Sequence, residues 1–203
     1  MIGSRLHHSR RQYYEETSTH LGVYCRKVGL TPNILTALSF LCAIASGYFF
    51  WKSEIWYGVI FVLLTSLMDM LDGATARAGN MGTTFGGILD HVSDRYGEFF
   101  ILLGIAISGM ANPGWAIFAL FGMLIASYTR AAAESIGNLP SVAVGMMGRL
   151  EKFILIMAGA LLEKYFPGYH ILAIFLIIIG VTSVITSVQR LLFAKKELER
   201  RSA

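Results

Sequence analysis

Four aspartates lie close together in a short segment that interrupts a strongly apolar sequence. Asp69 and Asp72 follow the apolar run FVLLTSLM, and Asp90 and Asp94 precede the apolar run FFILLGIAI. An ionised side chain near the centre of a bilayer costs roughly 2.5–3.5 kcal/mol even on the lenient insertion scales. Four carboxylates in such a sequence therefore need a compensating partner, and their segment is the first candidate for binding or catalysis.

The spacing of these aspartates predicts two acidic helix faces. Asp69 and Asp72 are three residues apart and Asp90 and Asp94 are four apart, so each pair shares one face of a helix. The glycine-rich stretch GNMGTTFGG at 79–87 would turn the chain between the two helices and could bring the faces opposite each other. Like charges at these spacings repel, and they repel far more strongly in a medium of low dielectric.

Divalent cations are the partners that this acidic set favours. Oxygen ligands with no nearby cysteine and only His91 as an imidazole favour Mg²⁺, Mn²⁺ or Ca²⁺ over zinc. Because Mg²⁺ keeps waters and phosphate oxygens among its ligands, four carboxylates indicate two ions, which could clamp a phosphate and orient an attacking oxygen. Gly73 would let a ligand approach the backbone, and Arg77 adds a cation suited to phosphate.

Two alternative roles for the acidic segment stay open on spacing alone. The aspartates could form buried salt bridges with Arg77 and Arg95, although four acids against two arginines leave a surplus of negative charge. They could also line a proton or cation pathway in a membrane transporter.

The elements that must position the aspartates are membrane-spanning helices. Of the 203 residues, 55% are hydrophobic and 15% are charged, and the mean hydropathy is +0.58, which is too apolar for an ordinary soluble domain. Apolar runs of about 20 residues indicate spans. The sequence predicts an all-α integral membrane protein with six transmembrane helices, near 33–51, 55–76, 88–109, 113–136, 149–166 and 169–194.

The remaining segments are short. Residues 1–30 mix charged and apolar side chains and lack the long apolar region of a signal peptide, which predicts a juxtamembrane amphipathic helix at the interface. Residues 31–195 would form the six-helix catalytic domain and residues 196–203 a basic cytoplasmic tail. Thr31 before Pro32 predicts the N-terminus of the first span, an end that suits a phosphate.

Basic residues are distributed unevenly between the two predicted sides of the membrane. The side with both termini and the loops after spans 2 and 4 collects 15 of the 17 Lys and Arg residues, leaving Lys52 and Lys164 on the other side. This asymmetry predicts a multi-pass protein of the cell membrane with both termini and the active site on the cytoplasmic side. The net charge of +4 then needs no nucleic-acid partner, because anionic lipid headgroups attract such residues.

The acidic segment resembles the signature of the CDP-alcohol phosphotransferase family. The six-span layout is similar too, so the resemblance covers nearly the whole chain. The eight specified positions of the signature are occupied, at the family's spacing, by Asp69, Asp72, Gly73, Ala76, Arg77, Gly86, Asp90 and Asp94.

The resemblance implies transfer of a substituted phosphate from a CDP-lipid to an acceptor hydroxyl, with release of CMP. It implies that Asp69, Asp72 and Asp90 hold one Mg²⁺ or Mn²⁺ ion and that Asp69, Asp90 and Asp94 hold a second. Asp94 would also be the general base. The family further suggests a homodimer among membrane lipids. The residues that would contact the CDP-alcohol are Pro32, Asn33, Ile34, Leu35, Asp69, Asp72, Gly73, Arg77 and Thr83.

Basic residues at the cytoplasmic ends of the later spans are candidates for binding a phosphorylated acceptor. Arg130, Arg149, Lys152 and Arg190 could form such a pocket, because arginine forks match phosphate oxygens. An alternative stays open, because cytoplasmic helix ends carry Arg and Lys in any case and Arg130 can pair with Glu134 at i, i+4.

The flanking sequences favour inositol phosphate as the acceptor. SYTRAAAE, GRLEK and VQRLL resemble stretches of the phosphatidylinositol-phosphate and archaetidylinositol-phosphate synthases, although Gly148 and Lys152 depart from that branch's acidic-Arg-x-Glu-Arg run. The resemblance therefore implies inositol 1-phosphate and a CDP-lipid with diacylglycerol or archaeol chains. Glycerol 3-phosphate or another small alcohol is the alternative acceptor, and a transporter with an acidic cation site is the distant alternative.

Overall fold

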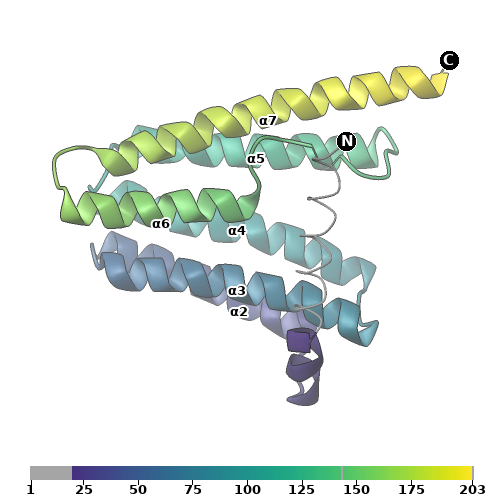
Figure 1. Ribbon diagram of the computed structural model, residues 1–203, viewed down its shortest axis with the longest axis horizontal. Helices are drawn as coiled ribbons and strands as arrows, with labels where there is room; N and C mark the ends of the chain where they lie inside the picture. The colour runs from purple at the N-terminus through teal and green to yellow at the C-terminus, as the bar shows by residue number, and fades with distance from the viewer. Residues whose placement is uncertain (1–19, 143, 203) are drawn as a thin grey trace, which may run out of the picture. The chain divides into compact units, whose positions relative to one another are not determined.

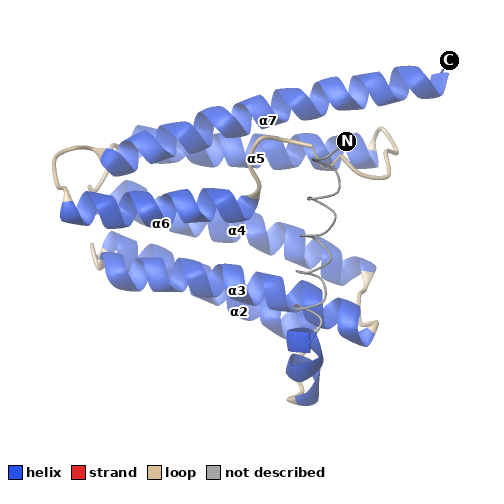
Figure 2. Ribbon diagram, viewed as in Figure 1, coloured by secondary structure: helices blue, strands red, loops and turns tan. Residues whose placement is uncertain are grey.

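The computed structural model describes residues 20–142 and 144–202, and its regular structure within those ranges is helical (Figure 2). The prediction of an all-α protein is therefore confirmed for this part of the chain. The helices follow the predicted apolar runs in order (Figure 1). They are α2 (Pro32–Trp51), α3 (Ile55–Gly79), α4 (Thr84–Ser108), α5 (Pro113–Ser135), α6 (Arg149–Tyr165) and α7 (Ile171–Ser202).

Four helices in the described ranges are long and apolar enough to cross a membrane, namely α2, α3, α5 and most of α7. Helix α4 falls short because it carries Asp90, Asp94, Arg95 and Glu98 in one stretch. Helix α6 has 17 residues, fewer than the about 20 of a usual span. The chain is thus a multi-pass membrane protein, and the count of six spans stays a prediction.

The chain divides into two compact units. One unit consists of Met1–Ala45 and Phe61–Gly97, of which the structure describes residues from 20 onward. The other consists of Ser46–Ile60 and Glu98–Ala203. The four aspartates belong to the first unit, and the basic residues of the predicted acceptor pocket belong to the second.

Small residues bring the helices of the first unit into close contact. Residues 20–27 are helical, and Gly22 lies so close to α3 that an added Cβ would overlap the carbonyl group of Ala74. On α4, an added Cβ at Gly97 would lie 3.1 Å from the Cβ of Ala43 on α2. Residues 1–19 lie outside the described residues, so the interfacial amphipathic helix over residues 1–30 stays a prediction.

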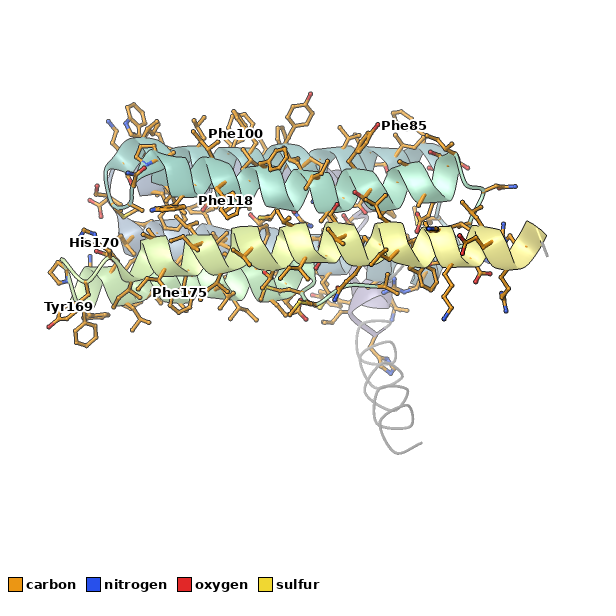
Figure 3. All side chains as sticks on the ribbon, turned by 90° about the horizontal axis from the view of Figure 1, so that it is seen from above. Phe85, Phe100, Phe118, Tyr169, His170 and Phe175 are labelled. Carbon is orange, nitrogen blue, oxygen red and sulfur yellow. The ribbon has the colours of Figure 1, made fainter. Side chains whose placement is uncertain are left out.

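Glycines also set the packing of α5, α6 and α7 in the second unit. An added Cβ at Gly122 of α5 would lie 2.8 Å from the carbonyl oxygen of Gly180 on α7. One at Gly159 of α6 would lie 3.1 Å from the Cβ of Phe175 on α7, a residue labelled in Figure 3. Because small residues let backbones approach closely in lipid, these helices pack with little side-chain material between them.

The ends of two helices position candidate site residues. Helix α2 begins at Pro32, as predicted, and the side-chain oxygen of Thr31 lies 3.4 Å from the amide nitrogen of Ile34. Helix α7 continues to Ser202, so the predicted basic tail extends this helix. In that tail, Arg201 donates a hydrogen bond from Nη1 to the carbonyl oxygen of Asn138, at 2.9 Å. The tail therefore holds the chain after α5.

Candidate metal and substrate site

The aspartates of α3 and α4 form two overlapping groups. One carboxylate oxygen from each of Asp69, Asp72 and Asp90 lies within 4.8 Å of the other two. The ligand atoms of Asp90, His91 and Asp94 satisfy the same limit. Asp90 belongs to both groups and joins them. The predicted meeting of two acidic helix faces across the glycine-rich turn is therefore observed.

The acidic groups fit divalent cations. Asp72 is 6% exposed, whereas Asp69, Asp90 and Asp94 are half-buried and His91 is exposed. Carboxylates held this close repel one another, and burial strengthens the repulsion. A hard divalent cation relieves it and prefers oxygen ligands, and the nearby imidazole is compatible with Mn²⁺. The chemistry of the donors thus suits Mg²⁺ or Mn²⁺.

The two arginines of the salt-bridge alternative are placed differently. Arg95 forms an ion pair with Asp94, with 3.5 Å between Nη2 and Oδ2. Arg77 folds back along α3, so that its Nη1 lies 3.3 Å from the position of an added Cβ at Gly73. Since each arginine carries one positive charge, the two together leave a net negative charge on the four aspartates. The salt-bridge alternative therefore explains Asp94 in part and leaves the acidic groups without full compensation.

Thr36 is a site residue that the sequence analysis missed. Its hydroxyl donates a hydrogen bond to Oδ2 of Asp72, at 2.9 Å, and both side chains are buried. The hydroxyl oxygen also lies 3.1 Å from the carbonyl oxygen of Pro32. Thr36 thus links the first turn of α2 to the most buried carboxylate of the acidic groups. A hydroxyl one turn after the predicted helix start is the signal that could have pointed to it.

Replacing Thr36 with valine is expected to weaken Mn²⁺ binding by about 10-fold, because the loss of an outer hydrogen bond to a metal ligand costs about 10–100-fold in affinity. Valine keeps the shape of threonine and removes only the donor. The dissociation constant for Mn²⁺, measured by isothermal titration calorimetry on the purified protein, checks this expectation.

Ser39 offers a matched control on the same helix. Its buried hydroxyl donates to the carbonyl oxygen of Thr65, at 3.0 Å, so it joins α2 to α3 without touching a carboxylate. Ser39→Ala should leave the Mn²⁺ affinity unchanged. If both variants weakened Mn²⁺ binding equally, Thr36 would act through helix packing and not through Asp72.

The starts of α2 and α4 meet at Gly86. The backbone N–H of Gly86 donates to the hydroxyl of Thr83, at 2.9 Å, so Thr83 caps α4. A Cβ at Gly86 would lie 2.9 Å from that hydroxyl oxygen and 3.2 Å from Oδ1 of Asn33. A side chain at Gly86 would thus crowd Thr83 and Asn33, both of which are predicted to contact the CDP-alcohol.

The predicted CDP-contacting segment at the start of α2 is only partly accessible. Asn33 and Ile34 are exposed, and Ile34 keeps 44% of its surface accessible. Leu35 is 1% exposed and belongs to the core of the first unit. The side chains of Asn33 and Ile34 are therefore open to a ligand, and the contact predicted for the buried Leu35 stays a prediction.

Two of the predicted acceptor-binding residues begin α6. Arg149 is its first residue, and Lys152, one turn later, is 6% exposed. The Nε of Arg149 lies 3.7 Å from Oε1 of Glu98, a buried carboxylate that the sequence analysis did not single out. The Cζ of Arg149 also lies 5.0 Å from the centre of the Phe153 ring.

The other two predicted acceptor-binding residues, Arg130 and Arg190, contact other groups of the protein. Arg130 pairs with Glu134, with 2.9 Å between Nε and Oε1, which is the i, i+4 alternative left open by the sequence. Arg190 donates from Nε to the carbonyl oxygen of Val144, at 2.9 Å, and from Nη1 to that of Ala126. A role for these two arginines in acceptor binding stays a prediction.

Apolar membrane-crossing helices and convergent carboxylates together define an integral membrane protein with a candidate divalent-cation site. Residues 29–188 match the family model of the CDP-alcohol phosphatidyltransferases. The chain belongs to this family.

Relatives of known activity cover most of the chain. An archaetidylinositol phosphate synthase of Pyrococcus horikoshii is 35% identical over 180 residues, which are 88% of this chain and 91% of that protein. A phosphatidylinositol phosphate synthase of Mycolicibacterium smegmatis is 31% identical over 189 residues, 89% of this chain and 84% of that protein.

Solved structures of a third relative are similar in fold. The phosphatidylinositol phosphate synthase of Mycobacterium tuberculosis with CDP-DAG bound has a TM-score of 0.75 and 29% identity, covering 87% of this chain and 92% of that chain. The same protein in complex with manganese and citrate has a TM-score of 0.75 and 29% identity, covering 87% and 88%.

Proposed function

We propose that this protein is a phospholipid-headgroup synthase that transfers the substituted phosphate of a CDP-lipid to a hydroxyl of inositol 1-phosphate and releases CMP. The convergence of Asp69, Asp72 and Asp90 carries the proposal, because the family's signature residues come together in a form suited to divalent cations. The synthases of inositol phospholipids among the relatives support the choice of substrates.

The proposed cofactor is Mg²⁺ or Mn²⁺, as two ions. Asp69, Asp72 and Asp90 would hold one ion, and Asp69, Asp90 and Asp94 would hold the other. When bound, such ions neutralise phosphate oxygens and stabilise the charge that develops during transfer. The complex of a relative with manganese supports this assignment.

The protein's own side chains orient the donor and move one proton. Arg77 would pair with a phosphate of the donor, and Asn33, Thr83 and Gly73 would line the nucleotide. Asp94 would take the proton of the acceptor hydroxyl as that oxygen bonds to the phosphorus attached to the lipid. The bond from this phosphorus to the bridging oxygen breaks, and CMP leaves with that oxygen.

The acceptor's phosphate is assigned to the start of α6. Arg149 and the buried Lys152 present two cations there, and arginine binds phosphate in a bidentate manner. Arg130 and Arg190 complete the proposed set and also keep their contacts with Glu134 and the carbonyl groups of Val144 and Ala126.

We place six spans in the membrane, with both termini and the acidic groups on the cytoplasmic side. The 15 Lys and Arg residues on that side support the orientation. Exposed aromatic side chains at the opposite ends of the helices suit a membrane interface there, because such residues favour the interface. Figure 3 shows Tyr169 at the connection between α6 and α7. Labelling of single cysteines introduced at Lys52 and Arg200 from either side of a sealed vesicle would establish the orientation. The exposed aromatic residues at the ends opposite the acidic groups are Trp51, Trp56, Tyr165 and Tyr169.

A homodimer belongs to the proposal on the basis of the family alone. Light scattering coupled to size-exclusion chromatography would measure the mass of the protein in detergent, and the mass of a single chain would reject the dimer.

The decisive test is a panel assay with purified protein, a CDP-lipid and Mn²⁺. We expect CMP release to be fastest with inositol 1-phosphate and slower with glycerol 3-phosphate or serine, in assays with either CDP-diacylglycerol or CDP-archaeol. Fastest release with glycerol 3-phosphate would change the acceptor and keep the reaction. A protein that releases no CMP with any acceptor would reject the enzyme and favour the transporter.

A further inference from the structure

We infer that Glu98 is a positioning residue that holds the guanidinium of Arg149 in the orientation needed to bind the acceptor's phosphate. The inference rests on the proposed function, in which Arg149 binds that phosphate. It extends the proposal to a buried carboxylate that lies outside the family signature.

Glu98 is buried to a degree that is unusual for a carboxylate. Its side chain is 1% exposed, in helix α4 four residues after Asp94. Acidic side chains are almost never fully buried unless they are paired, because removing an ion from water costs several kcal/mol. A buried Glu98 therefore needs compensating partners, and Arg149 is one of them.

Arg149 is held on two sides and is still reachable. Its Nε lies 3.7 Å from the Glu98 carboxylate, and its Cζ lies 5.0 Å from the centre of the Phe153 ring. A guanidinium is planar, so an ion pair at one edge and an aromatic ring beside it restrict its rotation. The side chain of Arg149 is 17% exposed, compared with 1% for Glu98. A soluble ligand could thus touch the exposed part of Arg149, whereas Glu98 lies out of its reach.

The first turn of α6 is an unfavourable position for a cation whose only role is to stabilise the fold. The N-terminal end of a helix carries a partial positive charge and favours anions. Arg149 and Lys152 nevertheless occupy its first turn, and the N-cap residue Gly148 has no side chain that could cap the helix. Exposed Glu151 turns back toward Gly148, so that its Oε2 lies 2.6 Å from the position of an added Cβ there. A buried carboxylate that keeps Arg149 in place makes sense if the arginine is needed for an anionic ligand.

The test is a double-mutant cycle on binding, with Glu98→Gln, Arg149→Ala and the two combined. Isothermal titration calorimetry on the purified full chain measures the dissociation constants of inositol 1-phosphate and of CDP-diacylglycerol. We expect Glu98→Gln to weaken inositol 1-phosphate binding about 10-fold, a coupling typical of contacting residues. It should leave CDP-diacylglycerol binding unchanged, and it should weaken acceptor binding no further when Arg149 is alanine.

Several results would overturn the inference. Unchanged or tighter acceptor binding in Glu98→Gln would do so, as would a full additional loss in the Arg149→Ala background. Equal weakening of both substrates would show that Glu98 supports only the fold. If Glu98→Gln does not purify as a single species, Glu98→Asp replaces it in the same cycle, because it keeps the charge but shortens the side chain, and the same criteria apply.

Glu163→Gln is the matched control. Glu163 is another glutamate of the second unit, half-buried, and its Oε2 accepts a hydrogen bond from the backbone N–H of Leu172, at 3.1 Å. It should not change the affinity for either substrate.

The cycle also separates this inference from the proposed function. Because it measures binding without turnover, a wild-type protein that releases no CMP would reject the proposed reaction while the cycle still decides the role of Glu98. Normal CMP release together with an unaffected Glu98→Gln variant would reject the inference and keep the reaction. Wild-type protein that binds no inositol 1-phosphate would overturn the inference.

Discussion

Replacing Asp90 with asparagine is expected to abolish divalent-cation binding and CMP release together. Asp90 is the residue common to the group with Asp69 and Asp72 and the group with His91 and Asp94. Its loss would therefore impair both proposed ions, whereas a change at Asp72 would impair one. We expect the Mn²⁺ affinity to fall more than about 100-fold, which exceeds the usual cost of losing an outer hydrogen bond. Electron paramagnetic resonance of bound Mn²⁺ measures this without turnover.

Glu54→Gln supplies the control for Asp90→Asn. The chain contains no aspartate besides those at 69, 72, 90 and 94, so an exposed glutamate in the turn before α3 is the nearest equivalent change from carboxylate to amide. It should leave Mn²⁺ binding and CMP release at the wild-type level. Wild-type Mn²⁺ affinity in Asp90→Asn would contradict the proposed two-ion site.

Replacing Asp94 with asparagine is expected to reduce kcat about 10²–10⁴-fold, the usual contribution of a general base. The acceptor hydroxyl would then lack the carboxylate proposed to receive its proton. Binding of the CDP-lipid should largely survive, because the proposed donor contacts lie at Asp69, Asp72 and the starts of α2 and α4. Initial rates of CMP release and the dissociation constant of CDP-diacylglycerol check the two expectations separately.

The outcome for Asp94→Asn also separates a base from a metal ligand. If Asp94 serves as the base, the ion held by Asp69, Asp72 and Asp90 should remain bound and turnover should not recover at high Mn²⁺. Recovery at high Mn²⁺ would assign Asp94 to metal binding alone. Unchanged turnover at ordinary Mn²⁺ would reject both roles.

The helices and the acidic groups could be predicted because they depend on local rules. Apolar runs of the length of a bilayer placed the helix ends to within four residues, except that α7 continues eight residues beyond its predicted end, and Thr31 with Pro32 marked the start of α2. Spacings of three and four residues put each pair of aspartates on one face, and the short glycine-rich turn left the two faces little freedom except to meet.

The partners of the site residues could not be predicted in the same way. Thr36 and Asp72 are 36 positions apart, and many hydroxyl groups in apolar helices could have served as the donor. The partner of Glu98 was equally hard to predict, because a single glutamate in an apolar run does not indicate which cation it will contact. Such contacts depend on how helices rotate and cross, which hydropathy does not encode.

The basic residues also show that the sequence does not predict the partners of site residues. Their positions at predicted cytoplasmic ends fitted both a phosphate pocket and the ordinary flanks of spanning helices. The structure gives each arginine a partner of its own, because Arg190 holds backbone carbonyl groups, Arg130 holds Glu134, and Arg149 lies between Glu98 and Phe153. Their role in acceptor binding stays a prediction. Leu35 likewise lies in the predicted donor-binding segment and is buried, so its contact with the donor stays a prediction.

The sequence by itself determined that the chain crosses a membrane, that it carries an acidic segment needing cations, and that this segment has the family's spacing. These properties follow from composition and from helical periodicity, which act over a few residues. Only the tertiary structure showed that Thr36 donates a hydrogen bond to Asp72, that Gly86 lies against the side chains of Thr83 and Asn33, and that Glu98 pairs with Arg149. Those contacts join distant segments, and they arise because buried polar groups must find partners wherever the packed helices bring them.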